Sequence, residues 1–220
     1  MMKKTAYVDF DGTVVDVMPR YHGILESYLK KDNLIELDYT EYCFLKRKGI
    51  KDHEIVYRLC NGLKIDIESY LEFKRPNLES SFWLKKDIII GSPKDAYNKL
   101  KCLGYNVVLL TQRNYEKRLL QQVAGLGLDN CFDEVLVVKP LLRGNAKLNV
   151  LKDKINSEDI IIGDSKIEME CADFLYINGF FVESGLWGTT FAGEKSLIFK
   201  TYNLVVDFLL QSSGKINSRM

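Results

Sequence analysis

The sequence predicts an α/β fold, a Rossmann-like parallel sheet that carries an inserted all-helical domain. Five short apolar runs have the length and composition of buried strands, at residues 5–8, 106–110, 134–138, 160–162 and 180–182. Helical patterns separate these runs, and strands that alternate with helices form parallel sheets. Residues 17–86 contain only helical patterns. We therefore expect a core domain of residues 1–16 and 87–220 and an inserted helical domain of residues 17–86.

The first strand ends in a turn that carries two carboxylates. Residues 9–13 read Asp-Phe-Asp-Gly-Thr directly after the strand. Gly12 disfavours continuation of the strand, because glycine readily adopts the positive φ of a tight turn. Asp9 and Asp11 should therefore lie together at the carboxyl end of a buried strand, where open α/β sheets place their ligands. Because the two carboxylates repel one another, the pair predicts a cation or a shared proton, and hard oxygen ligands suit Mg²⁺.

The helical insertion should contain about four helices. Apolar residues at helical spacing place them at about 21–31, 39–48, 52–61 and 66–79. Pro19 is suited to the first turn of the first helix. Asp52 and Asp66 are expected to be the N-caps of the third and fourth helices. Gly49 and Gly62 should end the second and third, because glycine is common just past a helix end.

The rest of the chain alternates between helices and strands. Ser92 followed by Pro93 predicts an N-cap and first turn, for a helix that ends near Gly104. Further helices are expected at about 115–126, 145–155, 167–172 and 202–210. The residues after the last helix should form a frayed tail.

Composition and charge narrow the class of protein. The chain has 220 residues, of which 46% are hydrophobic, enough for one sizeable core plus an insertion. Its 31 Lys and Arg balance 30 Asp and Glu, so charge gives no reason to expect nucleic acid or a membrane surface as a partner. Five cysteines without a Cys-x-x-Cys pair are better explained as reduced thiols than as a zinc site or disulfides. Because no signal-peptide or membrane-spanning stretch is evident, we expect a cytoplasmic protein.

Two stretches resemble motifs of the haloacid dehalogenase superfamily of phosphotransferases. Residues 9–13 resemble motif I, Asp-x-Asp-Gly-Thr. The apolar strand that leads into Thr111 resembles motif II, which implies that Thr111 contacts a phosphate group. Gln112, the next residue, is a candidate for substrate binding.

A third stretch resembles motif IV of the same superfamily, Gly-Asp-x-x-x-Asp. Gly163 and Asp164 follow the fourth strand, and Glu168 stands where the motif has its last Asp. Asp164 should therefore lie at the same edge of the sheet as Asp9. The resemblance implies a Mg²⁺ site held by Asp9, the main-chain carbonyl of Asp11 and Asp164, to which Glu168 could contribute through the metal's waters.

Two lysines are candidates for motif III. Lys139 is followed by Pro140, a pair common in the family, and precedes Asp164 by a usual 25 residues. Lys147 precedes Asp164 by only 17 residues, but it lies in the first turn of the helix before the fourth strand, where the family places its lysine. The family's strand order, 5-4-1-2-3, puts the third strand and Lys139 two places from Asp9. We choose Lys147 and keep Lys139 as the alternative.

The helical insertion resembles a type 1 cap, because it lies between motifs I and II. Phosphoglycolate phosphatase and β-phosphoglucomutase carry caps of this class, which close over the site and supply substrate contacts. Arg20, at the start of the insertion, is therefore a candidate substrate-binding residue. Residues 183–188 resemble a glycine-containing loop found beside the site in many members with a cap, and no role is assigned to any one of them.

The resemblance implies a phosphatase that hydrolyses a small phosphorylated metabolite through an aspartyl-phosphate. Asp9 would attack phosphorus, and Asp11 would protonate the leaving group and then activate water. Lys147 and Thr111 would offset the charge of the phosphate. Asp11 argues against a dehalogenase, whose leaving halide needs no acid. A phosphomutase would share all these residues, whereas a non-catalytic binding protein is disfavoured because the nucleophile is present.

Overall fold

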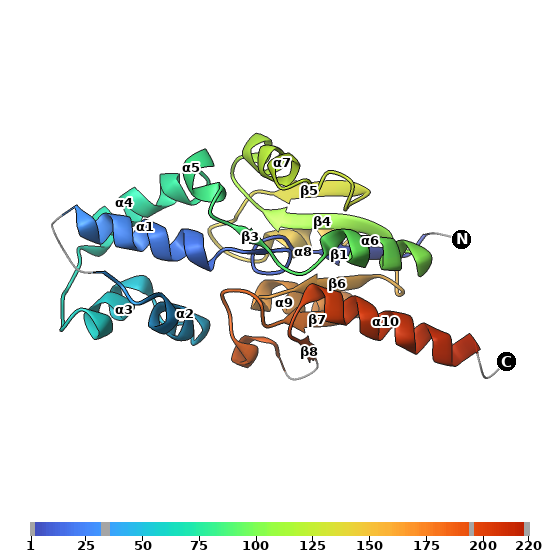
Figure 1. Cartoon of the computed structure of the whole chain (residues 1–220). Helices are drawn as coiled ribbons and strands as arrows, with labels where there is room; N and C mark the ends of the chain where they lie inside the picture. Colours follow the sequence, from blue (N-terminus) through green and yellow to red (C-terminus); the bar gives the residue numbers. More distant parts are fainter. Residues whose placement is uncertain (1–2, 32–35, 194–195, 218–220) are drawn as a thin grey trace.

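In the computed structural model, which describes residues 3–31, 36–193 and 196–217, six strands form one parallel sheet (Figure 1). They are β1 (Thr5–Val8), β4 (Asn106–Gln112), β5 (Glu134–Val138), β6 (Ile160–Gly163), β7 (Asn178–Val182) and β8 (Leu197–Phe199). Their order is β5-β4-β1-β6-β7-β8, and each neighbouring pair is parallel. The predicted α/β sheet, its five strands and their order are confirmed, and β8 is an additional edge strand.

Helices cover both faces of the sheet. Side chains alternate along a strand, so Ala6 and Val8 of β1 point to one face and Tyr7 points to the other. The first face packs against α6 (Pro93–Cys102), α7 (Glu116–Gly125) and α10 (Tyr202–Asn217). The second face packs against α8 (Ala146–Leu151) and α9 (Lys166–Leu175). The sheet is therefore buried on both sides, which explains the continuous apolar runs of its strands.

The last helix is longer than expected. It continues to Asn217 instead of ending near residue 210. The hydroxyls of Ser212 and Ser213 donate hydrogen bonds to the carbonyls of Phe208 (2.8 Å) and Leu209 (3.0 Å), one turn earlier. Serine hydroxyls that bond in this way are compatible with a continuing helix.

The insertion is all-helical, as expected. Its helices are α1 (Met18–Lys30), α2 (Tyr39–Arg47), α3 (Asp52–Leu59), α4 (Ile67–Leu78) and a short additional helix, α5 (Ser81–Leu84). These helices enclose a hydrophobic cluster of their own, which includes Leu25, Tyr42 and Ile55. Figure 1 shows them beyond the end of β1, where the chain enters α1. The domain boundaries at residues 16/17 and 86/87 remain a prediction.

One of the two predicted caps in the insertion is correct. The Asp66 side chain accepts a hydrogen bond from the Ser69 N–H at 2.7 Å, as an N-cap should. Asp52, by contrast, is the first residue of α3, and Lys51 is the N-cap. The Asp52 carboxylate turns into the insertion because Lys46 and Lys74 form ion pairs with it there.

A second, small sheet joins the two ends of the insertion. β2 (Val15–Asp16) pairs antiparallel with β3 (Ile88–Ile89). The pairing brings the segment that leaves the core next to the segment that returns to it, close to the end of β1. Among the described helices, none is long and apolar enough to cross a membrane.

Candidate active site

The candidate site lies where β1 ends and the chain turns toward α1. Asp9 is 7% exposed, and its N–H donates to the Ile162 carbonyl at 2.9 Å, so pairing with β6 continues through this residue. Gly12 then adopts a φ of +83°, the tight turn expected from the sequence. Thr111 is buried on the neighbouring strand β4, and the partly buried Gln112 ends that strand. The structure therefore places the predicted motif I and motif II residues at the ends of adjacent strands.

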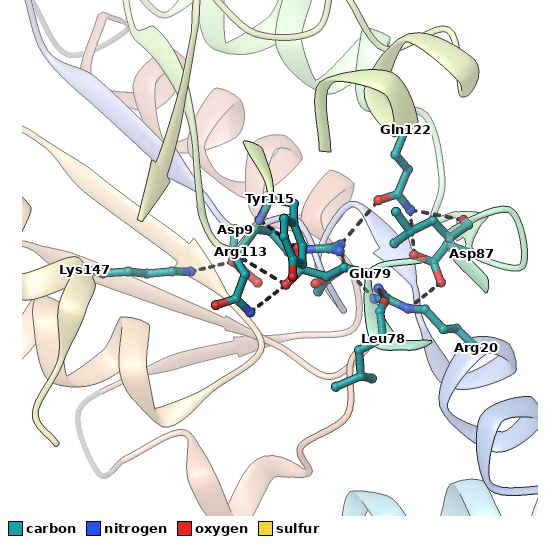
Figure 2. A network of polar contacts seen from close by, with 12 residues as sticks. Asp9, Arg20, Leu78, Glu79, Asp87, Arg113, Tyr115, Gln122 and Lys147 are labelled. Carbon is teal, nitrogen blue, oxygen red and sulfur yellow. Dashed lines mark hydrogen bonds and ion pairs between the residues drawn. The ribbon is translucent and has the colours of Figure 1, made fainter. Parts of the chain in front are cut away.

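Lys147 reaches Asp9 from the first turn of α8. Its Nζ lies 2.5 Å from Asp9 Oδ1, and its side chain is 3% exposed (Figure 2). Asn145 caps the helix by accepting a hydrogen bond from the Leu148 N–H at 3.0 Å. Lys139 is exposed just past the end of β5. Of the two candidate lysines, the structure thus brings Lys147 to the Asp9 carboxylate.

Glu168 binds the same lysine. Its Oε1 lies 2.5 Å from Lys147 Nζ, and its Oε2 accepts hydrogen bonds from the N–H and the hydroxyl of Ser165. The Ser165 hydroxyl accepts a hydrogen bond from the Ile167 N–H at 3.1 Å, so Ser165 and Glu168 form a capping box at the start of α9. Both carboxylate oxygens of Glu168 are engaged, and one of them orients Lys147.

Asp164 fits into a tight space between two main-chain segments. It is 4% exposed, and the Leu186 N–H donates to its Oδ2 at 2.9 Å. A Cβ atom added to Gly185 would lie 1.7 Å from this oxygen, and one added to Gly12 would lie 2.3 Å from it. Residues 183–188, which the sequence left without individual roles, therefore form one wall around Asp164. Only glycine at positions 12 and 185 leaves room for the carboxylate.

The buried acids carry more negative charge than the neighbouring lysine neutralises. Lys147 forms ion pairs with Asp9 and Glu168, and its charge also acts on Asp164, so three acids face one ammonium; with all three ionised, the formal excess is two negative charges. Burial raises the pKa of Asp9 to about 7, although Lys147 opposes this rise. Burial and then repulsion by Asp9 and Glu168 raise the pKa of Asp164 well above its usual range. Burial alone would lower the pKa of Lys147, but Asp9 and Glu168 raise it, so the ammonium stays charged.

This excess of negative charge fits a divalent cation. In the described part of the chain, no three His, Cys, Asp or Glu side chains converge as a complete metal-binding group. Magnesium, however, is often held by one or two carboxylates together with water and substrate phosphate. Asp9 and Asp164 could supply those two carboxylates. The Asp11 carboxylate binds two arginines and the Glu168 carboxylate binds Lys147, so the expected contributions of the Asp11 main-chain carbonyl and of Glu168 through metal-bound water stay predictions.

Asp11 is held by two buried arginines. The Nη2 atoms of Arg20 and Arg113 lie 2.9 Å and 2.6 Å from its Oδ1. Burial opposes ionisation of this carboxyl, but Arg113 and Arg20 together lower its pKa below the ordinary value. In the sequence, only the position of Arg113 two residues after Thr111 could have indicated a role for it, and none was predicted.

Arg20 is enclosed within the protein. It is 1% exposed, its Nη1 donates to the Leu78 carbonyl at 2.7 Å, and its Nε forms an ion pair with Asp87 at 3.1 Å. Gln122 donates to Asp87 at 2.7 Å and accepts from Arg113 at 3.3 Å. Figure 2 shows these side chains pointing toward one another. Each of the three guanidinium nitrogens of Arg20 contacts a protein group, and the substrate contact expected for Arg20 stays a prediction.

A basic cavity of about 230 Å³ lies between the insertion and the loop of residues 183–188. It is lined by Tyr21, Lys46, Gly49, Ile50, Lys51, Leu186 and Trp187. Leu186 belongs to the loop that also binds Asp164. Lys46 and Lys74 share the single carboxylate of Asp52, so this part of the insertion has an excess of positive charge.

Two of three comparisons with known proteins found matches, one to the sequence and one to the fold. A family model described as haloacid dehalogenase-like hydrolase matches residues 7–182. The search of proteins with curated functions found no match. The fold is similar to that of a predicted phosphatase from Clostridium acetobutylicum, with a TM-score of 0.68, 15% identity and coverage of 96% of this chain and 100% of that chain.

Two further solved structures share the fold. A predicted phosphoglycolate phosphatase from Haemophilus somnus has a TM-score of 0.68 and 20% identity, over 94% of this chain and 98% of that chain. The HAD-hydrolase YfnB from Bacillus subtilis, solved with bound magnesium, has a TM-score of 0.60 and 15% identity, over 95% and 99%. At these identities, the structural matches support the fold alone. Because the family model spans most of the sequence, from β1 to β7, this chain belongs to the haloacid dehalogenase-like hydrolases.

Proposed function

We propose that this hydrolase is a Mg²⁺-dependent phosphatase that cleaves a small phosphomonoester through an aspartyl-phosphate. The observation that carries the proposal is the ion pair between Lys147 and Asp9 at the end of β1. A carboxylate that a cation holds at the end of a buried strand is suited to attack phosphorus, because the cation offsets the charge of the incoming phosphate.

The residues of the site would divide the reaction into two steps. In the first, an Asp9 oxygen forms a bond to phosphorus and the bond from phosphorus to the leaving oxygen breaks. Asp11 gives that oxygen a proton, which it would carry once the negative charge of the bound phosphate offsets the effect of the two arginines on its pKa. In the second, Asp11 takes a proton from water as the water oxygen attacks phosphorus, which releases phosphate and restores Asp9. Lys147, Thr111 and Gln112 would hold the phosphate oxygens during both steps.

The metal would be held by the Asp9 and Asp164 carboxylates and by the main-chain carbonyl of Asp11. When bound, Mg²⁺ would offset the negative charge of the phosphoryl group. We place Glu168 outside the direct ligands, because its oxygens contact Lys147 and Ser165. The two excess negative charges of the acid cluster support this assignment.

The basic cavity indicates the kind of substrate. Lys46 and Lys51 line it, and its wall at Leu186 is continuous with the loop that holds Asp164. A leaving group that extends into this cavity would therefore meet positive charge. We propose that the preferred substrate carries a second anionic group, such as a carboxylate, on its leaving group.

A panel of phosphomonoesters tests both parts of the proposal. Phosphate release by the purified full chain should require Mg²⁺, and Asp9→Asn should abolish it, because an amide does not replace the attacking carboxylate.

A matched pair of substrates tests the cavity: 2-phosphoglycolate should give a kcat/KM at least about tenfold above that of 2-hydroxyethyl phosphate, since a charge-assisted contact contributes roughly 1.5–3 kcal/mol. Lys51→Met should reduce this ratio. Folded protein without Mg²⁺-dependent turnover would refute the phosphatase, and equal rates for the pair would refute the anionic preference alone.

A further inference from the structure

Both arginine contacts to Asp11 involve the same carboxylate oxygen. Arg20 and Arg113 both donate to Oδ1, and in the described part of the chain no hydrogen bond is found on Oδ2. The Asp11 side chain is 26% exposed, whereas the two arginine side chains are 2% and 3% exposed. The carboxylate is therefore anchored in the protein through one oxygen and keeps the other available.

The two arginines are themselves held in place by a ring of partners. Asp87 pairs with Arg20, Gln122 bridges Asp87 and Arg113, and the Leu78 carbonyl accepts from Arg20 (Figure 2). The ring contains two arginines and two aspartates, so its formal charge is balanced. Its members come from the end of β1, α1, α4, the segment before β3, the end of β4 and α7. Asp11 is thus fixed from several elements of both the core and the insertion.

A buried charge network of this kind is a poor means of stabilising a fold. Desolvation of the ions offsets much of their attraction, and well-packed apolar side chains often stabilise a protein as well or better. What such a network provides is a defined orientation for each group. Here the group with a free oxygen is the carboxyl that the proposed reaction uses for proton transfer.

We propose that Arg20 and Arg113 are positioning residues that hold Asp11 by Oδ1 so that its Oδ2 is aimed at the leaving-group oxygen. Two guanidinium donors occupy Oδ1, so Oδ2 is the oxygen that gives the proton to the leaving group and later takes one from water. The inference rests on the proposed phosphatase reaction. In that reaction the two arginines would act through their effect on Asp11.

A comparison of two leaving groups distinguishes a positioning role of the arginines from a purely structural one. An alkoxide is a poor leaving group and needs a proton, whereas p-nitrophenolate leaves readily without one. Arg113→Met should therefore lower kcat/KM for an alkyl phosphate by about 10²-fold, within the range for losing general acid catalysis. We compare kcat/KM because it reports the steps up to departure of the leaving group and excludes the later attack by water, which both substrates share. With p-nitrophenyl phosphate, the same variant should lose less than about threefold on this argument. Arg118→Met, which changes an arginine on α7 that donates to the Glu79 carbonyl, is the matched control and should leave both rates unchanged.

A double-mutant cycle separates positioning from damage to the fold. In an Asp11→Asn background, adding Arg113→Met should cause little further loss with the alkyl phosphate, because the group that Arg113 orients is already absent. If Arg113→Met folds poorly, Arg113→Lys can replace it in the test. Lysine keeps the charge but has only one donor nitrogen, so this variant should show the same selective loss to a smaller extent. Equal losses for both substrates, or additive losses in the cycle, would overturn the positioning role while leaving the phosphatase intact. A folded wild-type chain that releases no phosphate would overturn both.

Discussion

Replacing Lys147 by Met removes the cation from the acid cluster and keeps an unbranched side chain. In the protein, Lys147 Nζ lies 2.5 Å from Asp9 Oδ1 and 2.5 Å from Glu168 Oε1, and the side chain is 3% exposed. Without this ammonium, Asp9, Glu168 and Asp164 form a buried group of three carboxylates that has lost its lysine. A phosphate that enters this site would then meet uncompensated negative charge.

Lys147→Met should therefore lower both kcat and the free energy of unfolding. Loss of one preorganised donor at a reacting group lowers kcat by about 10²–10³-fold, or roughly 2.7–4 kcal/mol. Removal of one partner from a buried ion pair destabilises a fold by about 3–5 kcal/mol. Lys139 is exposed and lies outside this cluster, so Lys139→Met should change kcat by less than about twofold and the free energy of unfolding by about 0.5 kcal/mol at most.

The assay compares the two variants in steady-state phosphate release and in urea unfolding. Because Lys147→Met is expected to be less stable, rates should be measured at a temperature where circular dichroism shows it fully folded. A near-normal kcat for folded Lys147→Met would contradict the role of Lys147. A larger loss for Lys139→Met would return motif III to the alternative lysine.

Two further changes test other parts of the molecule. Gly185→Ala would place a Cβ 1.7 Å from Asp164 Oδ2. If the Asp164 carboxylate shifts by about 1 Å as a result, the rate should fall by about 10²-fold and the Mg²⁺ concentration for half-maximal activity should rise. An unchanged Mg²⁺ titration would contradict the assignment of Asp164 as a ligand. Asp52→Asn should lower the free energy of unfolding by about 3 kcal/mol at pH 7, because Lys46 and Lys74 lose their shared partner. Burial opposes ionisation of Asp52, but the two lysines hold its pKa below the ordinary value, so the wild type's advantage should be present above about pH 4 and decline at lower pH. Urea unfolding at several pH values checks this, and equal stabilities at pH 7 would contradict it.

The strands that form the site could be predicted because their signal is local. Each is a run of apolar residues that ends in a polar one, and parallel strands bring those ends to one edge of the sheet. Asp9, Thr111 and Asp164 are therefore placed at one edge by their position in the sequence, whereas the contact of Thr111 with phosphate was expected only from the resemblance to motif II. The choice of Lys147 over Lys139 also followed from topology, since it depended on which strand and helix lie next to β1.

The elements that the sequence did not reveal depend on distant pairing. β2 and β3 contribute two residues each to their sheet, and they pair because the two ends of the insertion meet there. β8 is a three-residue strand at the edge of the sheet, and two of its three residues are exposed. Asp52 has the residue type and position of an N-cap, and its true partners lie on two other helices. Local patterns carry no information about such contacts.

The partners of Arg20 and Arg113 at the centre of the site also could not be predicted from local sequence patterns. In the sequence each is a single basic residue, and for Arg20 a contact with an anionic substrate was the natural expectation. Arg113 and Asp11 are separated by 102 positions, and Arg20 and Leu78 by 58. A lone arginine is almost never fully buried, so the 1% exposure of Arg20 requires that its partners be assembled from several elements. The fold creates the partners, and the partners in turn decide that these arginines face Asp11 within the protein.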